Sequence, residues 1–235
     1  MFVPSLPTGQ LTLRESSPCG TGTLRLVWEV TTPPTAGWSY RPGQFINLGF
    51  AGELWRSYSL TSLAAELPLL ELLVRVGEDG FGPGTRHLLR MRVGETLPYR
   101  GAYGRFQLMG ETDTRQICIA TGTGIAPFRS LLRGVGGQRV MLLYGEKTLQ
   151  HVSYSEEIAQ WQAETVLCLS RDEKNHPILS THHGRVTDYL EAHPELLRPS
   201  YHYYLCGSSV MLESAGALLR QAGVERRQIH TEQFY

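Results

Sequence analysis

The spacing of hydrophobic and polar residues changes near residue 110 of this 235-residue chain. Before that point, short runs that alternate between the two kinds of residue are separated by glycine and proline, and Leu24, Leu26 and Trp28 belong to one such run. Alternation with a period of two is typical of strands that bury one face. Several short strands joined by turns favour an antiparallel barrel or sandwich. The predicted strands are Gln10–Glu15, Gly22–Val30, Gln44–Phe50, Arg56–Thr61 and Leu69–Val76, with one helix over Thr85–Met91.

After that point, continuous apolar runs alternate with segments of helical character. The apolar runs are Gln116–Ala120, Arg139–Tyr144, Thr165–Ser170 and Tyr203–Cys206. The helical segments are Ala126–Leu132, Ser155–Trp161, Arg185–Leu190 and Val210–Gln221, and we expect a last strand over Gln228–Phe234. Strands that are apolar throughout and alternate with helices indicate a parallel sheet covered on both faces. We place the domain boundary in Glu111–Arg115, which gives domains of residues 1–110 and 111–235.

Composition narrows the classes of function. Hydrophobic residues make up 41% of the chain, which is enough for a buried core, and a formal net charge of zero gives no reason to expect a nucleic-acid partner. The four cysteines lack the spacing of an iron–sulfur or zinc site, so we expect no metal. No apolar run reaches the about 18 residues of a membrane span, and the N-terminus lacks a signal-peptide pattern. We expect a cytoplasmic protein with no membrane partner, acting as a monomer.

A glycine-rich turn follows the first apolar run of the second half. It reads Thr121, Gly122, Thr123, Gly124, and Pro127 lies in the first turn of the helix that follows. Glycines let the backbone approach a phosphate closely, and a helix N-terminus offers free N–H donors. These four residues are therefore candidates to bind a pyrophosphate. The alternative is a tight strand-to-helix turn without a ligand.

Cations follow the next strands at the same predicted edge of the sheet. Lys147 follows the second strand of this half, Ser170 and Arg171 end the third, and Arg185 opens a helix. Convergent cations would bind a phosphate monoester and so select NADPH over NADH. The alternative is solvated surface charge, because 20 of the 22 cations are arginines. Asp172 beside Arg171 would oppose an anion unless it points away.

A second dense group of polar residues lies in the first half, along a predicted strand. Arg56, Tyr58 and Leu60 alternate with Ser57 and Ser59, so each set shares one face. An arginine can clamp a pyrophosphate, a tyrosine can stack on a planar ring, and a serine hydroxyl can hydrogen-bond a ring nitrogen. The alternative is an ordinary amphipathic edge strand.

This strand resembles the R-x-Y-S flavin motif of the ferredoxin–NADP reductase superfamily, and further motifs of that family follow in the same order. They are Gly82 to Thr85, Gly101 to Phe106, Thr121 to Pro127, Ser170-Arg171, Cys206 to Met211, and Glu232 with an aromatic ending. The resemblance covers residues 56–235 and implies an FAD-binding antiparallel β-barrel followed by an NADP-binding α/β domain. Ala102 departs from the family, which usually has proline at that position.

The resemblance also implies roles for individual residues. Arg56 would bind the FAD pyrophosphate, Tyr58 would stack on the isoalloxazine ring, and Ser59 would lie beside flavin N5. Ser59, Cys206 and Glu232 would align the nicotinamide and the flavin as the catalytic residues. Other implied cofactor-binding residues are Ser57, Val74, Arg75, Gly84, Thr85, Lys147, Ser170, Arg171 and Arg185.

The aromatic ending leaves one question open. The stacking aromatic of the family usually lies two residues after the glutamate, which is Phe234 here, and some bacterial members add a further aromatic, which would be Tyr235. The sequence does not decide which ring would cover the flavin. A buried end of the last strand is the alternative for both.

The activity that the resemblance implies is hydride transfer from NADPH to FAD, followed by transfer of single electrons to an acidic ferredoxin or flavodoxin. A slight basic excess in the first half would suit such a partner, although a solvated surface accounts for it equally well. The arginines concerned are Arg14, Arg41, Arg75, Arg90, Arg92, Arg100 and Arg105.

Two other functions remain open at this point. One is the reductase component of an oxygenase, or a reductase of free flavin that uses NADH or NADPH. The other is a regulatory module that binds flavin without catalysis. The retained Ser59, Cys206 and Glu232 count against that second alternative, because a pure binder has no need to align a hydride donor.

Overall fold

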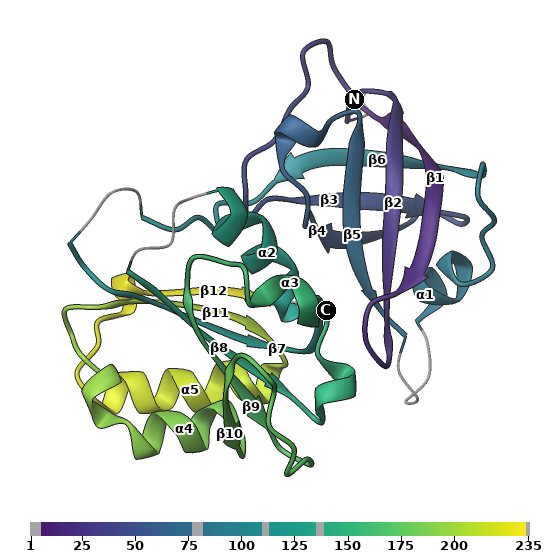
Figure 1. The fold of residues 1–235 in the computed structure, drawn as a ribbon. Helices are drawn as coiled ribbons and strands as arrows, with labels where there is room; N and C mark the ends of the chain where they lie inside the picture. The colour runs from purple at the N-terminus through teal and green to yellow at the C-terminus, as the bar shows by residue number, and fades with distance from the viewer. Residues whose placement is uncertain (1–5, 77–81, 110–112, 135–138, 234–235) are drawn as a thin grey trace.

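The computed structural model describes residues 6–76, 82–109, 113–134 and 139–233. Within them, the chain forms an antiparallel six-stranded sheet and then a parallel six-stranded sheet (Figure 1). The predicted fold class, an antiparallel β-barrel followed by an α/β parallel-sheet domain, is confirmed.

The antiparallel sheet closes on itself. In space its strands follow the order β4-β3-β6-β1-β2-β5, and the two end strands meet where Leu60 pairs with Leu72. Alternate side chains of these strands fill one core, which is the reason for the period-two pattern in the sequence. The strands are β1 (Gly9–Pro18), β2 (Thr23–Thr32), β3 (Phe45–Phe50), β4 (Leu54–Ser59), β5 (Leu69–Arg75) and β6 (Thr96–Tyr103), with the helix α1 (Pro83–Leu88) before β6.

The parallel sheet has the order β10-β9-β8-β7-β11-β12. The order reverses between β7 and β11, and ligands of such sheets bind outside the carboxyl ends of the strands at that switch point. The strands are β7 (Gln116–Thr121), β8 (Val140–Glu146), β9 (Glu164–Leu169), β10 (Ser180–His183), β11 (His202–Gly207) and β12 (Ile229–Gln233).

Helices cover both faces of the parallel sheet (Figure 1). Ala120 and Tyr144 pack with α2 (Ile125–Gly134) and α3 (Ser155–Ile158) on one face. Their neighbours Ile119 and Leu143 pack on the other face with α4 (Val186–Ala192) and α5 (Ser209–Gln221). Because both faces are buried, these strands read as continuous apolar runs.

The sequence pattern does not predict β6 and β10. Strand β6 contains Pro98 and Gly101, which read as turn residues, yet it lies between β3 and β1. Strand β10 is a polar edge strand of the sequence Ser-Thr-His-His, without the apolar run that predicts a buried strand. Two helices are also shorter than predicted, since α1 ends at Leu88 and α3 at Ile158.

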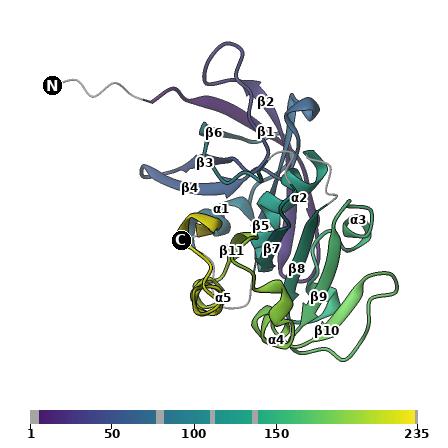
Figure 2. The ribbon, with the colours of Figure 1, turned by 90° about the vertical axis from the view of Figure 1, so that its left-hand side faces the viewer.

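The barrel and the α/β part are packed together. Figure 2 shows α2 and β7 beside β5 of the barrel. Leu73 of β5, with Phe106 and Leu108, joins the apolar cluster beneath α2, and the Gly43 amide donates a buried hydrogen bond of 3.1 Å to Ser130 Oγ. Among the described residues, no helix has the length and apolar character needed to cross a bilayer.

Candidate active site

The ends of β4 and β12 meet through one hydrogen bond. Ser59 Oγ donates to Glu232 Oε1 at 2.6 Å, across 173 residues of sequence. Burial raises the pKa of Glu232, and the hydrogen bond from Ser59 opposes that rise. The bond joins the barrel strand that carries the R-x-Y-S motif to the last strand of the parallel sheet.

Cys206 completes this group. It lies on β11, in register with Glu232 on one side and with Ala120 on the other. The side chain is fully buried, and burial, with the charge of Glu232, raises the pKa of the thiol well above its ordinary value. Cys206 therefore stays a neutral thiol, unlike a reactive cysteine, which needs a lowered pKa. Ser59, Cys206 and Glu232 thus lie together, as the sequence predicts.

The glycine-rich turn packs against the Cys206 segment. Gly124 lies so close to β11 that a Cβ at this position would overlap the carbonyl of Cys206. Gly207 has φ +148°, and the amide of Ser208 donates to Thr121 Oγ1 at 3.1 Å. The turn therefore has to be glycine-rich to lie at the switch point between β7 and β11.

Arg56 lies beside the start of α1. A Cβ on Gly84 would come within 3.2 Å of Arg56 Cγ and of Phe50 Cε2, so the backbone of the first helical turn approaches the arginine closely. The Arg56 guanidinium donates to the Trp55 carbonyl at 2.9 Å, and within the described part of the chain no carboxylate pairs with it. With Thr85 next in the chain, these groups fit the pyrophosphate of FAD.

The other residues predicted to bind the flavin differ in burial and in their contacts. Burial raises the pKa of Tyr58 to about 12, so it presents a neutral ring. Ser57 and Ser59 differ although they share a predicted face: Ser57 is exposed and donates to Asn47 Oδ1 at 2.7 Å, while Ser59 is buried by the parallel sheet. Val74 belongs to the barrel core, so only its backbone is available to a cofactor.

The predicted phosphate-binding cations share one rim. The amide of Arg171 donates to the Lys147 carbonyl at 2.8 Å, and the amide of Ser170 donates to the Glu146 carbonyl at 3.0 Å. Arg185 immediately precedes α4, and its side chain is exposed like those of Lys147 and Arg171. The strand ends thus bring these cations to the edge of the sheet that also carries the glycine-rich turn.

The carboxylate of Asp172 at this rim is bound to the backbone. Its carboxylate accepts hydrogen bonds of 3.1 Å from the amides of Leu149 and Lys174. These bonds lower its pKa and hold the carboxylate against the backbone.

Glu146 is a residue of this rim that sequence reasoning missed. It ends β8 directly before Lys147, and Tyr144 Oη donates to its Oε1 at 3.1 Å. Burial raises its pKa to about 7 against the effects of Tyr144, Lys147 and Arg75. An acidic residue one position beyond an apolar run, after Gly145, is the one signal that the sequence contains. The two terminal aromatics, Phe234 and Tyr235, lie outside the described residues.

Two family models match the chain. The oxidoreductase FAD-binding domain matches residues 11–108, which include all six barrel strands except the first two residues of β1. The oxidoreductase NAD-binding domain matches residues 118–216, which contain the glycine-rich turn and the cationic rim.

Individual proteins show the same similarity. The chain is 28% identical over 216 residues to "Ferredoxin--NADP reductase B" of Sorangium cellulosum, covering 83% of this chain and 85% of the relative. It is 29% identical over 214 residues to the reductase component of propane 2-monooxygenase from Rhodococcus jostii, covering 85% of this chain but only 56% of that relative. In fold, it superposes with a TM-score of 0.80 on a ferredoxin NADP+ reductase of Neisseria gonorrhoeae with bound FAD and NADP, at 20% identity, covering 97% and 99% of the two chains.

Proposed function

Because the chain belongs to the ferredoxin–NADP reductase superfamily and is an oxidoreductase with an FAD-binding and an NAD-binding domain, we propose that it transfers hydride from NADPH to FAD and passes the electrons singly to a ferredoxin or flavodoxin. The observation that carries the proposal is the hydrogen bond between Ser59 and Glu232, with Cys206 beside it. We assign residues 1–110 to FAD and 111–235 to the nucleotide.

The barrel residues hold and orient FAD. Arg56 and the backbone at Gly84 and Thr85 would bind its pyrophosphate, and the neutral ring of Tyr58 would pack on the isoalloxazine. Bound FAD supplies hydride acceptance and release of electrons one at a time. The Ser59 hydroxyl donates its one proton to Glu232, which fixes the orientation of the side chain and leaves its oxygen as an acceptor beside the flavin site.

The α/β residues hold the nicotinamide nucleotide. The turn from Thr121 to Gly124 binds its pyrophosphate at the start of α2. Cys206 and Glu232, which are in register on neighbouring strands, would flank the nicotinamide and orient it toward the flavin for hydride transfer. The neutral, buried thiol of Cys206 excludes water and adds no charge beside the transferred hydride.

A preference for NADPH is supported by the cationic rim. Lys147, Arg171 and Arg185 are exposed at one edge of the sheet, and the carboxylate of Asp172 is held by backbone amides. A 2′-phosphate carries close to two negative charges and prefers such a cluster, whereas the 2′-hydroxyl of NADH gains little from it.

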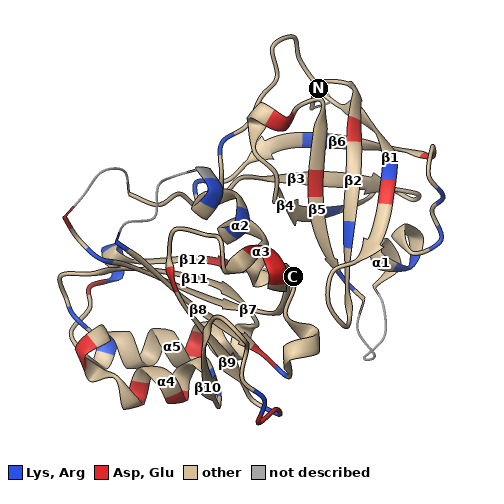
Figure 3. Ribbon diagram, viewed as in Figure 1, with Lys and Arg blue, Asp and Glu red and all other residues tan. Residues whose placement is uncertain are grey.

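An acidic electron acceptor is supported by the surface around α1. Figure 3 shows positive charge in α1 and in the segment that follows it. The cations there are Arg86, Arg90 and Arg92. Leu89, between Arg86 and Arg90, and Val93, directly after Arg92, are 41% and 63% exposed respectively. Helix α1 also contacts β4, which carries Arg56 and Tyr58, so a partner docked there lies close to the flavin strand.

A second candidate is the reductase component of an oxygenase. It is favoured by the relative from Rhodococcus jostii, whose identity of 29% equals that of the ferredoxin reductase within one percentage point. The two candidates share the hydride transfer from nucleotide to flavin and differ in the acceptor.

The test is anaerobic stopped-flow reduction of the purified protein by NADPH and by NADH. We expect a yellow protein with bound FAD that NADPH reduces with the higher kcat/KM. Mixing the reduced protein with a ferredoxin, a flavodoxin and an oxygenase component then distinguishes the acceptors. A colourless protein that refuses added FAD would overturn the proposal, and a preference for NADH would remove the assignment of the 2′-phosphate site.

A further inference from the structure

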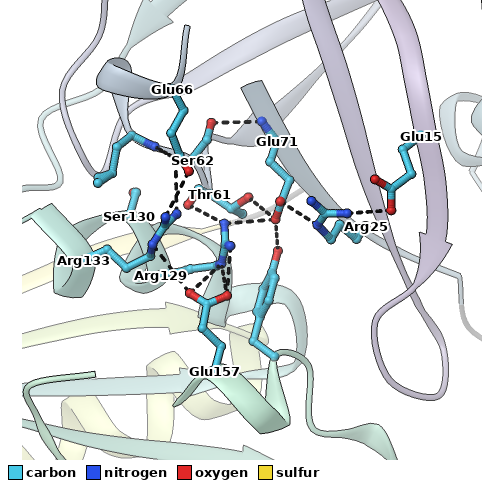
Figure 4. Close-up of polar contacts among 12 residues, drawn as sticks. Glu15, Arg25, Thr61, Ser62, Glu66, Glu71, Arg129, Ser130, Arg133 and Glu157 are labelled. Carbon is cyan, nitrogen blue, oxygen red and sulfur yellow. Dashed lines mark hydrogen bonds and ion pairs between the residues drawn. The ribbon is translucent and has the colours of Figure 1, made fainter. Parts of the chain in front are cut away.

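A chain of alternating charges crosses the interface between the barrel and the α/β part (Figure 4). We call it the charge chain. In order of contact it consists of Glu15, Arg25, Glu71, Arg129, Glu157, Arg133 and Glu66. The acids Glu15, Glu66 and Glu71 and the base Arg25 come from the barrel, and the others come from α2 and α3.

Glu71 is the buried centre of this chain. Its side chain is 7% exposed, and its Oε2 accepts from Arg25 Nε at 2.6 Å. Its Oε1 accepts from the hydroxyls of Thr61 and Tyr154 at 3.0 and 2.9 Å and pairs with Arg129 at 3.0 Å. Two of these partners come from the barrel and two from the α/β part, so one carboxylate holds both sides.

Arg129 makes the matching contacts from the other side. Its Nη1 donates to the Thr61 carbonyl at 3.0 Å, and its Nε and Nη2 donate to Glu157 at 3.0 and 2.9 Å. The guanidinium also lies over the ring of Tyr154, 4.6 Å from the centroid. Burial opposes the charge, but Glu71, Tyr154 and Glu157 hold the pKa of Arg129 above its ordinary value. Only a planar guanidinium, with its fork of fixed donors, can serve all these partners at once.

These contacts lie directly behind the candidate active site. Thr61 follows Ser59 by two residues, and Arg129 follows Gly124 by five residues within the first turns of α2. At about 3.6 residues per turn, Arg129 is roughly one and a half turns from the glycine-rich turn. The single side chain of Arg129 therefore ties the segment that would hold the flavin to the helix that would hold the nucleotide.

Stability alone does not account for such a chain. Buried ion pairs lose most of their Coulomb gain to desolvation, and apolar replacements are often neutral or stabilising. A fully satisfied network of directional hydrogen bonds instead favours one relative arrangement of its partners. Hydride transfer requires such an arrangement, because a misplacement of about 1 Å costs about 100-fold in rate.

We propose that Arg129, acting through Glu71 and the Thr61 carbonyl, is a positioning residue that sets the distance between the nicotinamide and flavin rings. This inference rests on the proposed function. It predicts that loss of Arg129 slows hydride transfer while the affinities for both cofactors stay nearly unchanged, since none of their binding residues is altered.

The first test uses the FAD-loaded full chain with Arg129→Gln and Arg129→Lys. We expect the limiting rate of reduction at saturating NADPH to fall about 100-fold for Arg129→Gln and about 10-fold for Arg129→Lys. The charge-transfer absorbance of the nucleotide–flavin complex should weaken in step, while KM and FAD retention stay within about threefold. Arg115→Gln is the matched control, because it breaks an Arg–Glu pair confined to the α/β part.

The second test measures the placement itself, without activity. Spin labels at Val93→Cys and Ile178→Cys report the distance between the two parts, since these residues are 63% and 76% exposed. A Cys19→Ser background leaves only buried cysteines. We expect one narrow distance distribution in the parent protein and in Arg115→Gln, and a broadened one in Arg129→Gln.

The outcomes separate the two proposals. A parent protein that neither nucleotide reduces overturns the proposed function, while the label distances still test the placement. Arg129 variants that keep the parent rate, charge-transfer band and narrow distribution overturn the positioning role. If Arg129→Gln does not fold, Arg129→Lys keeps the charge and decides both measurements.

Discussion

Two of the places where the barrel and the α/β part meet differ in construction. At the candidate active site the described contact is one hydrogen bond, between Ser59 and Glu232. At the charge chain, Glu71 and Arg129 are buried and fully hydrogen-bonded to both parts. A nucleotide has to enter between the two parts, so the contact at the site has to be small. The contacts that fix how the barrel and the α/β part are placed relative to each other therefore have to lie outside the candidate active site.

The largest effect should come from breaking the charge chain at its centre. Glu71→Ala leaves Arg129 and Arg25 buried or half-buried without their shared partner, which costs about 3–5 kcal/mol of unfolding free energy. Urea denaturation measures the loss. Glu29→Ala, which removes the exposed partner of Arg14 within the barrel, should cost at most about 1 kcal/mol. Equal losses of unfolding free energy from Glu71→Ala and Glu29→Ala would contradict a larger contribution from the contacts between the two parts.

The next prediction concerns Glu146, which lies at the cationic rim, and the pH dependence of the unfolding free energy. Its ordinary pKa of 4.5 is raised to about 7 by burial, so between these values the folded state binds more protons than the unfolded state. Stability therefore falls as pH rises from about 4.5 to 7, by about 3 kcal/mol in total. Glu146→Gln should remove this loss, with its full gain above pH 7 and no gain below pH 4.5.

The control for this prediction is Glu191→Gln, which changes an exposed carboxylate of α4. We expect its unfolding free energy to follow the parent protein at every pH. A gain from Glu146→Gln that does not depend on pH would contradict the stated cause.

Breaking the contact at the site should have a smaller effect on free energy and a specific effect on rate. Ser59→Ala removes a hydrogen bond to a carboxylate, worth roughly 1.5–3 kcal/mol, so hydride transfer should slow by roughly 10- to 100-fold. Because that bond lowers the pKa of Glu232, its loss should shift the pH profile of the rate upward. Ser17→Ala, on an exposed hydroxyl of β1, should alter neither rate nor profile.

The smallest effect concerns one cation of the rim. Arg171→Ala should raise the KM for NADPH about 10-fold and leave that for NADH unchanged, because a single charge-assisted contact with a phosphate is removed. Steady-state kinetics with both nucleotides measure it. Lys174→Ala, on the same loop, should change neither value, and a similar loss there would point to general charge attraction instead of a site.

Much of the fold can be read from the chain alone. Period-two alternation in Leu24, Leu26 and Trp28 predicts a barrel strand, and all three pack against the barrel core, Leu26 and Trp28 as buried members of it. Likewise, the apolar run before Thr121 predicts β7. Two strands escape this reasoning, because β6 contains proline and glycine and β10 is polar, and both are decided by pairing with distant neighbours.

Some residues of the candidate site could likewise be predicted from the sequence, and others could not. The alternation of residue types indicated Arg56 and Ser59, and the resemblance to the family implied Cys206 and Glu232. The structure brings Ser59, Cys206 and Glu232 together. The role of Glu146 could not be read, because its raised pKa comes from burial by residues that are distant in the sequence.

The sequence by itself determined the two kinds of sheet, the glycine-rich turn and the motif residues, because periodicity, turn chemistry and local spacing are properties of neighbouring residues. Only the tertiary structure decided that Glu71, in an apolar strand of the barrel, would meet Arg129 of α2. Each of these residues alone reads as an ordinary charge. The role of the pair depends on its desolvation at the interface between the barrel and the α/β part, and this interface forms only after both parts have folded and packed.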